Sequence, residues 1–194
     1  METKASLNRP RNIKFRKYRN NDGGKDMKLE LLRASSEMEA QYYDFINDWE
    51  KNGEAIVPYA ARLLDMDYNA WLDHTYKIET VNTCFVPAHT YFLVQENKKI
   101  IGAVNIRHYL NDYLFNFGGH IGYGIRPSER KKGYASLMLS LALPIAKELG
   151  IKKILITCDK NNVGSAKTMI NNGGVLENEV LEDGEITQRY WIEV

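Results

Sequence analysis

The sequence predicts a mixed α/β fold, in which helices cover the faces of a sheet. Short β-rich segments alternate along the chain with longer segments of helical pattern, and one of them, residues 152–159, has the continuous apolar core typical of a buried strand. The 194 residues are 44% hydrophobic and 26% charged, which is an ordinary composition for a globular protein. A chain of this length forms one domain, or one domain with an extension.

The first 26 residues differ from the rest of the chain. They carry a net charge of +5, whereas the remaining 168 residues carry −4. The segment lacks an apolar period and ends in the turn-like sequence NNDGG, so we expect residues 1–26 to be a disordered basic extension and residues 27–194 to be the folded domain. The extension either binds an acidic partner or has no role of its own.

The expected strands are bounded by turn residues or by proline. The sequence ENKK separates two of them, and Pro127 ends another because proline cannot donate to a ladder. These strands are expected at residues 27–33, 89–95, 100–109, 120–125, 152–159, 174–180 and 186–194. The sequence NDYLFNFGG, residues 111–119, is expected to form a loop or hairpin.

The expected helices carry start and stop signals. Ser36 is a candidate cap for the first helix, Gly150 occupies the C′ position of the third, and the sequence NNGG ends the fourth. These helices are expected at residues 37–52, within 55–79, at 135–149 and at 163–172. The third is apolar on nearly all sides and should be buried.

Charge and hydropathy exclude several classes of protein. The net charge of +1 does not indicate a nucleic-acid-binding protein, and no apolar stretch approaches the roughly 18 residues that span a membrane. The N-terminus has no apolar signal segment, so we expect a cytoplasmic protein with free thiols at Cys84 and Cys158 and no metal. A P-loop is absent, and the sequence GYGIRP has Pro127 where a dinucleotide-binding fingerprint needs its third glycine.

Three cations precede a glycine at the expected start of the third helix, in the sequence ERKKGYASLM. A helix N-terminus already carries partial positive charge, so Arg130, Lys131 and Lys132 are unfavourable there unless an anion binds. The unpaired N–H groups of the first helical turn can hold a phosphate, and Gly133 followed by the small Ala135 lets the backbone approach it. The residues therefore favour an anion site, with a solvated basic turn as the alternative.

The sequence RKKGYA, residues 130–135, resembles the R/Q-x-x-G-x-G/A signature of the GNAT superfamily of N-acetyltransferases. The preceding YGIRPSER is similar to the fourth strand of that family, and CDKNNVGSAKTMINNGG is similar to its next block, where an asparagine opens a helix. The resemblance covers roughly residues 90–194. It implies a GNAT-like α/β (α+β) fold, with a mixed, largely antiparallel sheet and helices on both faces.

The resemblance also implies that acetyl-CoA is the donor. Backbone groups of the strand 120–125 would meet the pantetheine arm, and the loop 130–135 would hold the pyrophosphate. The implied contacts are Tyr123, Gly124, Ile125, Arg130, Lys131, Lys132, Gly133, Tyr134, Ala135, Asn162 and Ser165. For Asn162, a plain helix cap is the alternative.

Acetyl transfer to an amine needs a proton acceptor for the amine and donors for the thioester oxygen. The resemblance places Met169 where many relatives have a tyrosine that protonates the thiolate. His120 is the candidate base because its ordinary pKa lies near neutrality, although the alignment puts Gly119 at the position of the base in some relatives. Tyr123 is the candidate acid. Structural roles are the alternatives for both residues, and Cys158 is either an inert thiol or a transient acetyl carrier.

In this architecture the acceptor pocket would be lined by residues 55–80 and 111–119. The aromatic residues expected there, with core packing as the alternative, are Tyr59, Tyr68, Trp71, Tyr76, Tyr113 and Phe115. The acidic candidates to receive an amine, otherwise solvated charges, are Asp48, Glu50 and Glu54.

The expected function is acetyl-CoA-dependent N-acetylation of a primary amine of a small molecule or peptide. A non-catalytic module that binds or senses acyl-CoA on the same fold is the alternative, because the usual tyrosine is missing. The sequence leaves open the acceptor and whether a homodimer forms.

Overall fold

The computed structural model describes residues 13–18, 27–80, 85–96 and 99–194. Its strands form two antiparallel sheets, one of five strands in the order β1-β2-β3-β4-β5 and one of three strands in the order β6-β8-β7. The strands of the first sheet are β1 (Ile13–Tyr18), β2 (Met27–Arg33), β3 (Ala88–Gln95), β4 (Ile100–Arg107) and β5 (Ile121–Ile125). Those of the second sheet are β6 (Lys153–Asp159), β7 (Val175–Glu182) and β8 (Glu185–Glu193).

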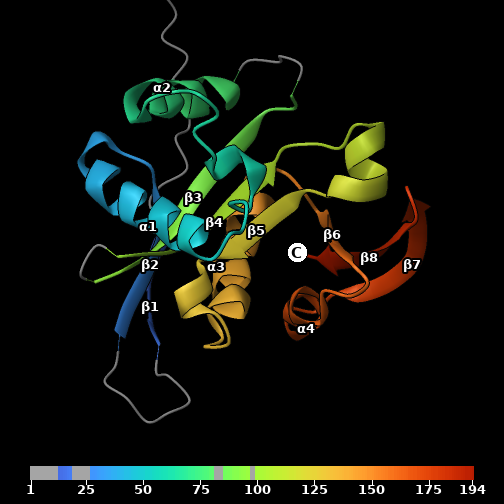
Figure 1. Ribbon diagram of the computed structural model, residues 1–194. Coiled ribbons are helices and arrows are strands. Elements are labelled where there is room, and N and C mark those ends of the chain that lie inside the picture. Colours follow the sequence, from blue (N-terminus) through green and yellow to red (C-terminus); the bar gives the residue numbers. More distant parts are fainter. Residues whose placement is uncertain (1–12, 19–26, 81–84, 97–98) are drawn as a thin grey trace, which may run out of the picture.

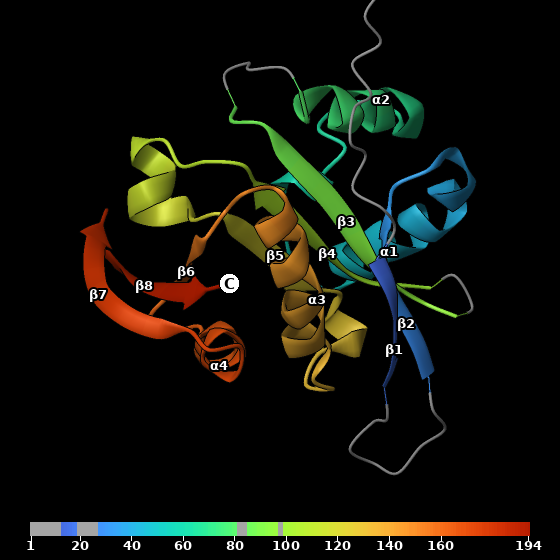
Figure 2. The ribbon, with the colours of Figure 1, turned by 180° about the vertical axis from the view of Figure 1, so that it is seen from behind.

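Helices cover both faces of the larger sheet, which confirms the predicted fold class. Helices α1 (Glu39–Lys51) and α2 (Tyr68–Ile78) lie on one face (Figure 1). Helix α3 (Tyr134–Glu148) lies on the other, as the reverse view in Figure 2 shows. Helix α4 (Val163–Asn171) packs beside α3 and against the smaller sheet.

Each face of the larger sheet has its own hydrophobic core. On the side of α1 and α2 the core is aromatic, with Tyr42 stacked on Trp71 at a ring-centroid distance of 4.7 Å and Phe92 of β3 beneath them. On the other side the core is largely aliphatic, and α3 contributes eight buried residues to it. This burial explains why α3 is apolar on nearly all sides.

The two sheets are joined where β5 begins and separate beyond that point. The backbone N–H of His120 donates to the carbonyl of Leu155 in β6 at 2.7 Å. Among the described strands, β5 is hydrogen-bonded only to β4, so its other edge is unpaired. The separation of the sheets leaves an open strand edge in the middle of the molecule.

Three of the expectations about secondary structure are wrong. Ser36 does not cap the first helix, because it lies within a 3-10 turn, η1 (Ser36–Met38), and the N-cap residue of α1 is Met38, whose side chain makes no cap bond. Residues 13–18, within the segment expected to be disordered, form β1 and pair with β2; Ile13 and Phe15 alternate there with Lys14 and Arg16, a strand period in a basic segment. The remainder of residues 1–26 lies outside the described part of the chain. The expected loop or hairpin 111–119 contains a π-helical turn, η3 (Leu114–Gly118), because the side chain of Asn111 accepts the N–H of Leu114 at 2.9 Å.

Candidate active site

A cleft of about 670 Å³ opens between β5, the start of α3 and the start of α4. It brings together ten of the eleven residues expected to contact acetyl-CoA: Tyr123, Gly124, Ile125, Arg130, Lys131, Gly133, Tyr134, Ala135, Asn162 and Ser165. The exception is Lys132, whose ammonium group donates to Glu129 at 2.8 Å. Segments that are up to 42 residues apart in the sequence, such as Tyr123 and Ser165, thus meet in one place.

The pairing of β4 with β5 determines which backbone groups face this cleft. The N–H of Arg107 bonds to the carbonyl of His120, and the N–H of Arg126 bonds to that of Ile101. Because bonded and non-bonded pairs alternate in an antiparallel ladder, Gly122 and Gly124 turn their peptide groups toward β4, and Tyr123 and Ile125 turn theirs toward the open edge. The carbonyl of Ile125 does accept a bond from the Arg130 side chain at 3.1 Å.

Gly124 therefore lines the cleft but does not offer it a backbone partner. The strand is tightly covered at this point by the segment that contains Val57, since a Cβ atom on Gly124 would lie 2.3 Å from the carbonyl oxygen of Val57. Only glycine fits at this position, and the segment that contains Val57 is held against β5.

The loop before α3 has the backbone geometry of an anion site. Lys131 and Gly133 have φ values of +64° and +80°, and Gly133 is the N-cap residue of α3. A left-handed conformation at the non-glycine Lys131 is strained, and such strain is concentrated at functional sites. Residues of this kind at a helix N-terminus direct backbone N–H groups into a concave surface that suits phosphate oxygens.

The side chain of Arg130 is engaged by an acid at the edge of the cleft. Its two terminal nitrogens donate to the two carboxylate oxygens of Glu54 at 2.9 and 2.7 Å, and its guanidinium lies over the ring of Trp49 at 4.9 Å. The hydrogen bonds from Arg130 lower the pKa of Glu54. Glu54 is thus an exposed charge that is paired with Arg130.

The residues expected near the thioester form a hydrogen-bonded group. The Tyr123 hydroxyl lies 2.8 Å from the Ser165 hydroxyl, and burial raises the pKa of Tyr123 to about 12. Burial also raises the pKa of the Cys158 thiol to about 11, which favours the inert role for that residue. Asn162 caps α4 by accepting the N–H of Ser165 at 3.0 Å, and it also lines the cleft. Met169 is fully buried.

His120 joins the two sheets. The ring Nδ1 of His120 accepts a hydrogen bond from the backbone N–H of Leu155 at 2.9 Å, and the backbone N–H of His120 donates to the Leu155 carbonyl. Burial and the nearby Arg107 lower the pKa of His120 to about 4, so the ring is neutral at physiological pH. His120 is not among the residues that line the cleft. The geometry favours the structural role over that of a general base.

A second cavity, of about 580 Å³, lies on the α2 side of the larger sheet. Of the aromatic residues expected around an acceptor, Tyr59, Trp71 and Tyr113 line it, whereas Tyr68, Tyr76 and Phe115 do not. Tyr68 and Tyr76 instead donate to the carbonyls of Ser35 and Ala34, in line with their packing role.

The two cavities approach each other at the segment that covers β5. Val57 lines the cleft, and Tyr59, two residues later, lines the second cavity. Between them, Pro58 faces Gly122 of β5, where an added Cβ atom would lie 3.4 Å away. A ligand bound in the cleft and a second ligand bound in the other cavity would therefore approach each other at β5.

The remaining acidic candidates lie outside both cavities. Asp48 accepts from Arg126 and from the Ser128 backbone, and although burial opposes it, these bonds lower the pKa of Asp48. Glu50 is exposed and lines neither cavity. Of the other histidines, His74 lines the second cavity, and His89 pairs with His108 at 2.7 Å.

Several site residues escaped the sequence analysis. Trp49 and Thr168 line the cleft, and Arg62, Asn105 and Arg107 line the second cavity. For Asn105 and Arg107 a signal was present: both interrupt the apolar strand β4 with a spacing of two, which places them on one face. Arg62 and Thr168 had no comparable signal.

The domain model of the GNAT acetyltransferases matches residues 28–175. The chain therefore belongs to the GNAT acetyltransferase family, whose chemistry is acyl transfer from acetyl-CoA. No curated protein sequence matches the chain.

Solved structures of several acetyltransferases share the fold. RimJ from Mycobacterium smegmatis, in complex with CoA-disulfide, is 14% identical with a TM-score of 0.64 over 86% of this chain and 82% of that one. The microcin C7 self-immunity acetyltransferase MccE, in complex with acetyl-CoA and AMP, is 19% identical with a TM-score of 0.61 over 86% and 92%. A ribosomal-protein-S5-alanine acetyltransferase from Vibrio fischeri is 17% identical with a TM-score of 0.61 over 85% and 92%.

Two kinds of feature are absent from the described residues. No helix among them is long and apolar enough to cross a membrane. The described part of the chain also contains no group of three or more His, Cys, Asp and Glu side chains placed to hold a metal ion.

Proposed function

We propose that the protein is an acetyl-CoA-dependent N-acetyltransferase that acts on a primary amine of a small molecule or peptide. One observation carries the proposal. The edge of β5 that has no neighbouring strand among those described, at Tyr123 and Ile125, opens into the same cleft as the left-handed loop at Lys131 and Gly133. This combination suits a ligand that has an amide-bearing arm at one end and a pyrophosphate at the other.

The chain's own groups would hold acetyl-CoA in two ways. The pantetheine amides would pair with the main chain of Tyr123 as an added strand does at a sheet edge. The pyrophosphate would accept hydrogen bonds from backbone N–H groups of the loop before α3. The Arg130 guanidinium would also bind it after breaking its ion pair with Glu54.

In the reaction, the lone pair of the neutral amine attacks the thioester carbonyl and forms the C–N bond. The carbonyl electron pair moves to oxygen, and its return breaks the C–S bond and releases the thiolate of CoA. The Tyr123 main-chain N–H, on the open edge, is the candidate donor to the oxyanion. The amine proton leaves through water, because the accepting nitrogen of His120 is bonded to Leu155.

The hydroxyl of Tyr123 suits hydrogen-bond donation better than full proton transfer. Its pKa is raised to about 12 by burial, whereas a thiol titrates at about 8.5, so transfer from the phenol to the thiolate is uphill. A donated hydrogen bond would still stabilise the leaving thiolate, which could then depart without the tyrosine that Met169 replaces.

The test is thiol release during incubation with acetyl-CoA and a broad panel of amines. Release that depends on both substrates, with one acetyl group found on the amine by mass spectrometry, supports the proposal. Saturable binding of acetyl-CoA with no turnover across the panel would instead support a non-catalytic acyl-CoA-binding module. This is the second candidate function because the buried Met169 stands where many relatives have a tyrosine that protonates the thiolate.

A further inference from the structure

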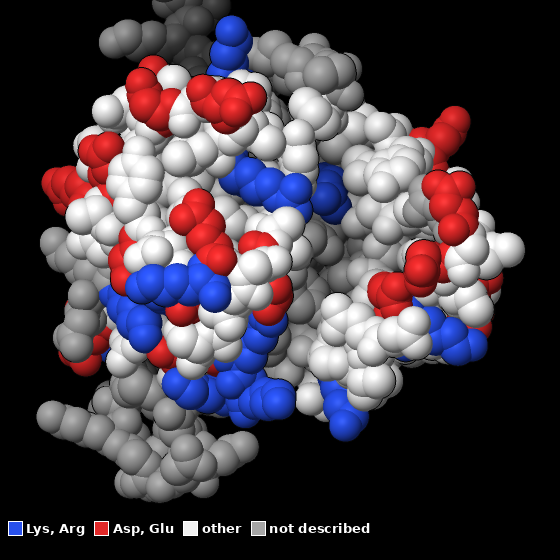
Figure 3. Space-filling view, in the orientation of Figure 1, with Lys and Arg blue, Asp and Glu red and all other residues white. Residues whose placement is uncertain are grey.

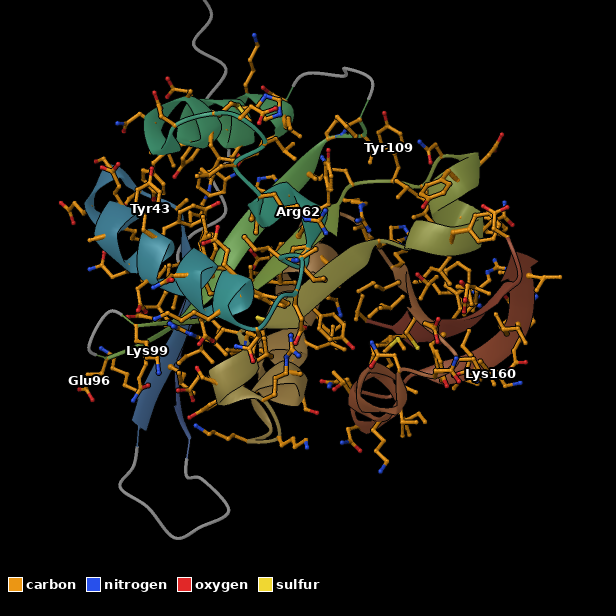
Figure 4. The ribbon with its side chains drawn as sticks, viewed as in Figure 1. Tyr43, Arg62, Glu96, Lys99, Tyr109 and Lys160 are labelled. Carbon is orange, nitrogen blue, oxygen red and sulfur yellow. The ribbon has the colours of Figure 1, made fainter. Side chains whose placement is uncertain are left out.

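The second cavity carries positive charge and no negative charge. Arg62 and Arg107 line it, and no Asp or Glu is among its described lining residues. In Figure 3, Lys and Arg atoms appear near the centre of the face, where the surface is hollowed between the two halves of the molecule. Figure 4 places Arg62 in this central region, between α2 and the strands β4 and β5.

Arg107 is a partly buried cation without an acid partner in the described part of the chain. Its Nη1 donates to the carbonyls of Gly118 and Gly119 at 2.8 and 2.9 Å, and burial lowers its pKa. Its Nη2 lies beside β5, 3.3 Å from where a Cβ atom on Gly122 would be. The guanidinium is thus fixed next to the strand along which the two cavities approach each other.

Arg62, which also lines the cavity, is held in a similar way. Its Nε donates to the carbonyl of Ile56 at 2.7 Å, and its guanidinium lies 5.1 Å from the centroid of the Tyr59 ring. Among the described residues, no carboxylate lies within ion-pair distance of it. Its two terminal nitrogens remain as donors, which is the fork geometry that carboxylates and phosphates accept.

A cavity with this charge disfavours a simple cationic amine. Like charges in a partly desolvated site repel, so an amine with no compensating anion would enter at a cost. An anionic oxygen group on the same molecule would instead form charge-assisted bonds with the guanidinium groups. The same positive field would lower the pKa of the acceptor's ammonium group and so supply the neutral amine that attack requires.

We infer that the acceptor carries an anionic oxygen group, a carboxylate or a phosphate, on the same small molecule as its amine, and that Arg62 and Arg107 bind this group. The apolar and aromatic walls formed by Tyr59, Trp71 and Leu114 suit an acceptor with an aromatic or aliphatic body between the two. The inference rests on the proposed N-acetyltransferase function and deepens it by naming the class of the acceptor.

The experiment compares matched amines that differ only in the anionic group, by turnover and by calorimetric binding in the presence of CoA. The pairs are tryptophan with tryptamine, tyrosine with tyramine, and phosphoethanolamine with ethanolamine, the last of which distinguishes a phosphate from a carboxylate. We expect the anionic member of at least one pair to have kcat/KM and affinity roughly tenfold or more above its partner, the scale of one charge-assisted bond.

Substitutions then assign the preference to the cavity. Arg62→Gln should reduce the advantage of the anionic member by roughly tenfold, and Arg62→Lys should restore part of it, because the charge returns without the fork. Arg107→Gln provides a second test, with the melting temperature measured to confirm folding. Lys147→Gln, an exposed change of equal charge on α3, should leave the preference unchanged.

The outcomes separate the two proposals. Anionic members that bind selectively but are never acetylated would support the inferred site and contradict N-acetyl transfer. Turnover of the partners that lack the anionic group at rates equal to those of the anionic members would overturn the inference and leave the proposed function intact. A preference that survives in both arginine variants would also overturn it.

Discussion

Glu54 holds both terminal nitrogens of Arg130, at 2.9 and 2.7 Å, at the edge of the cleft that is proposed to bind acetyl-CoA. The residue best suited to meet a pyrophosphate is therefore paired with a carboxylate in the free protein. Binding of the phosphates would require Arg130 to exchange one anion for another.

Glu54→Gln should tighten the binding of CoA by at most about fivefold, since an exposed ion pair of this kind stabilises by about 0.2–1 kcal/mol. The neutral amide frees Arg130 and removes a negative charge near the phosphates. Calorimetric titration with CoA measures the change, and Glu50→Gln is the charge-matched control. Weaker binding in Glu54→Gln alone would show that the pair instead builds the wall of the cleft.

Tyr123→Phe should lower kcat by roughly 10- to 100-fold and leave the affinity for CoA unchanged, because one hydrogen bond to the departing thiolate is lost while the main chain of β5 stays in place. The rate should show no alkaline limb from this residue below about pH 11, since its pKa is raised to about 12. Ser165→Ala, which removes the partner of the hydroxyl, is the control. A wild-type kcat in Tyr123→Phe would remove the hydroxyl from the mechanism.

His120 should govern stability in acid rather than the rate. Its pKa is about 4 in the folded protein and about 6.5 when unfolded, so the unfolded chain binds the extra proton between these values. Stability from the neutral ring is complete above pH 6.5 and is lost as the pH falls toward 4, by about 1.4 kcal/mol per pH unit. His89, with the same direction of shift, contributes in the same window.

His120→Asn places an oxygen near the position of Nδ1 and keeps an acceptor for the Leu155 N–H, whereas His120→Gln reaches further and does not. Urea unfolding at pH 7.5 and pH 5 should show Asn as the more stable variant at pH 7.5, and both variants with a weaker pH dependence than the wild type. Values of kcat/KM near the wild type in His120→Asn are expected. A large loss of rate, together with loss of a limb in the pH profile, would restore His120 as the base.

The N-terminal segment offers a test of β1. A chain that begins at Met27 lacks one of the two strands that pair with β2 and should melt at a lower temperature than one that begins at Ile13. Its affinity for CoA should not change, because β1 and β5 lie at opposite edges of the five-stranded sheet. Equal melting temperatures in the two chains would show that β1 adds nothing to stability.

The sequence was most informative where a local pattern determined the structure. The period of the strands and the stop signals of the helices predicted the fold class, and the family resemblance around Gly133 implied the ten residues that line one cleft. Tertiary partners were not readable in this way. The engagement of Arg130 by Glu54, 76 residues away, depends on how α1 packs on the sheet, and the neutrality of His120 depends on the junction with β6.

β1 was missed for a different reason. Its charge suggested disorder, although the alternation of Ile13 and Phe15 indicated a strand. The net charge of residues 1–26 obscured the two-residue alternation within these six residues. The basic lining of the second cavity was missed because Arg62 and Arg107 come from separate elements that meet only in the folded chain.

The most direct test of the CoA site uses two glycines at opposite ends of α3. Gly133, with φ of +80°, lies in the cleft. Gly150, with φ of +90°, follows the far end of the helix, and a Cβ atom there would meet open space within 4 Å. Valine at either position imposes a similar left-handed strain, so Gly150→Val controls for the loss of stability that Gly133→Val suffers.

The decisive measurement is calorimetric titration of both folded variants with CoA. The account predicts that Gly150→Val binds CoA as the wild type does, and that Gly133→Val shows no detectable binding because the side chain occupies the space of the pyrophosphate. Equal binding by Gly133→Val and Gly150→Val would contradict the assignment of this cleft to CoA.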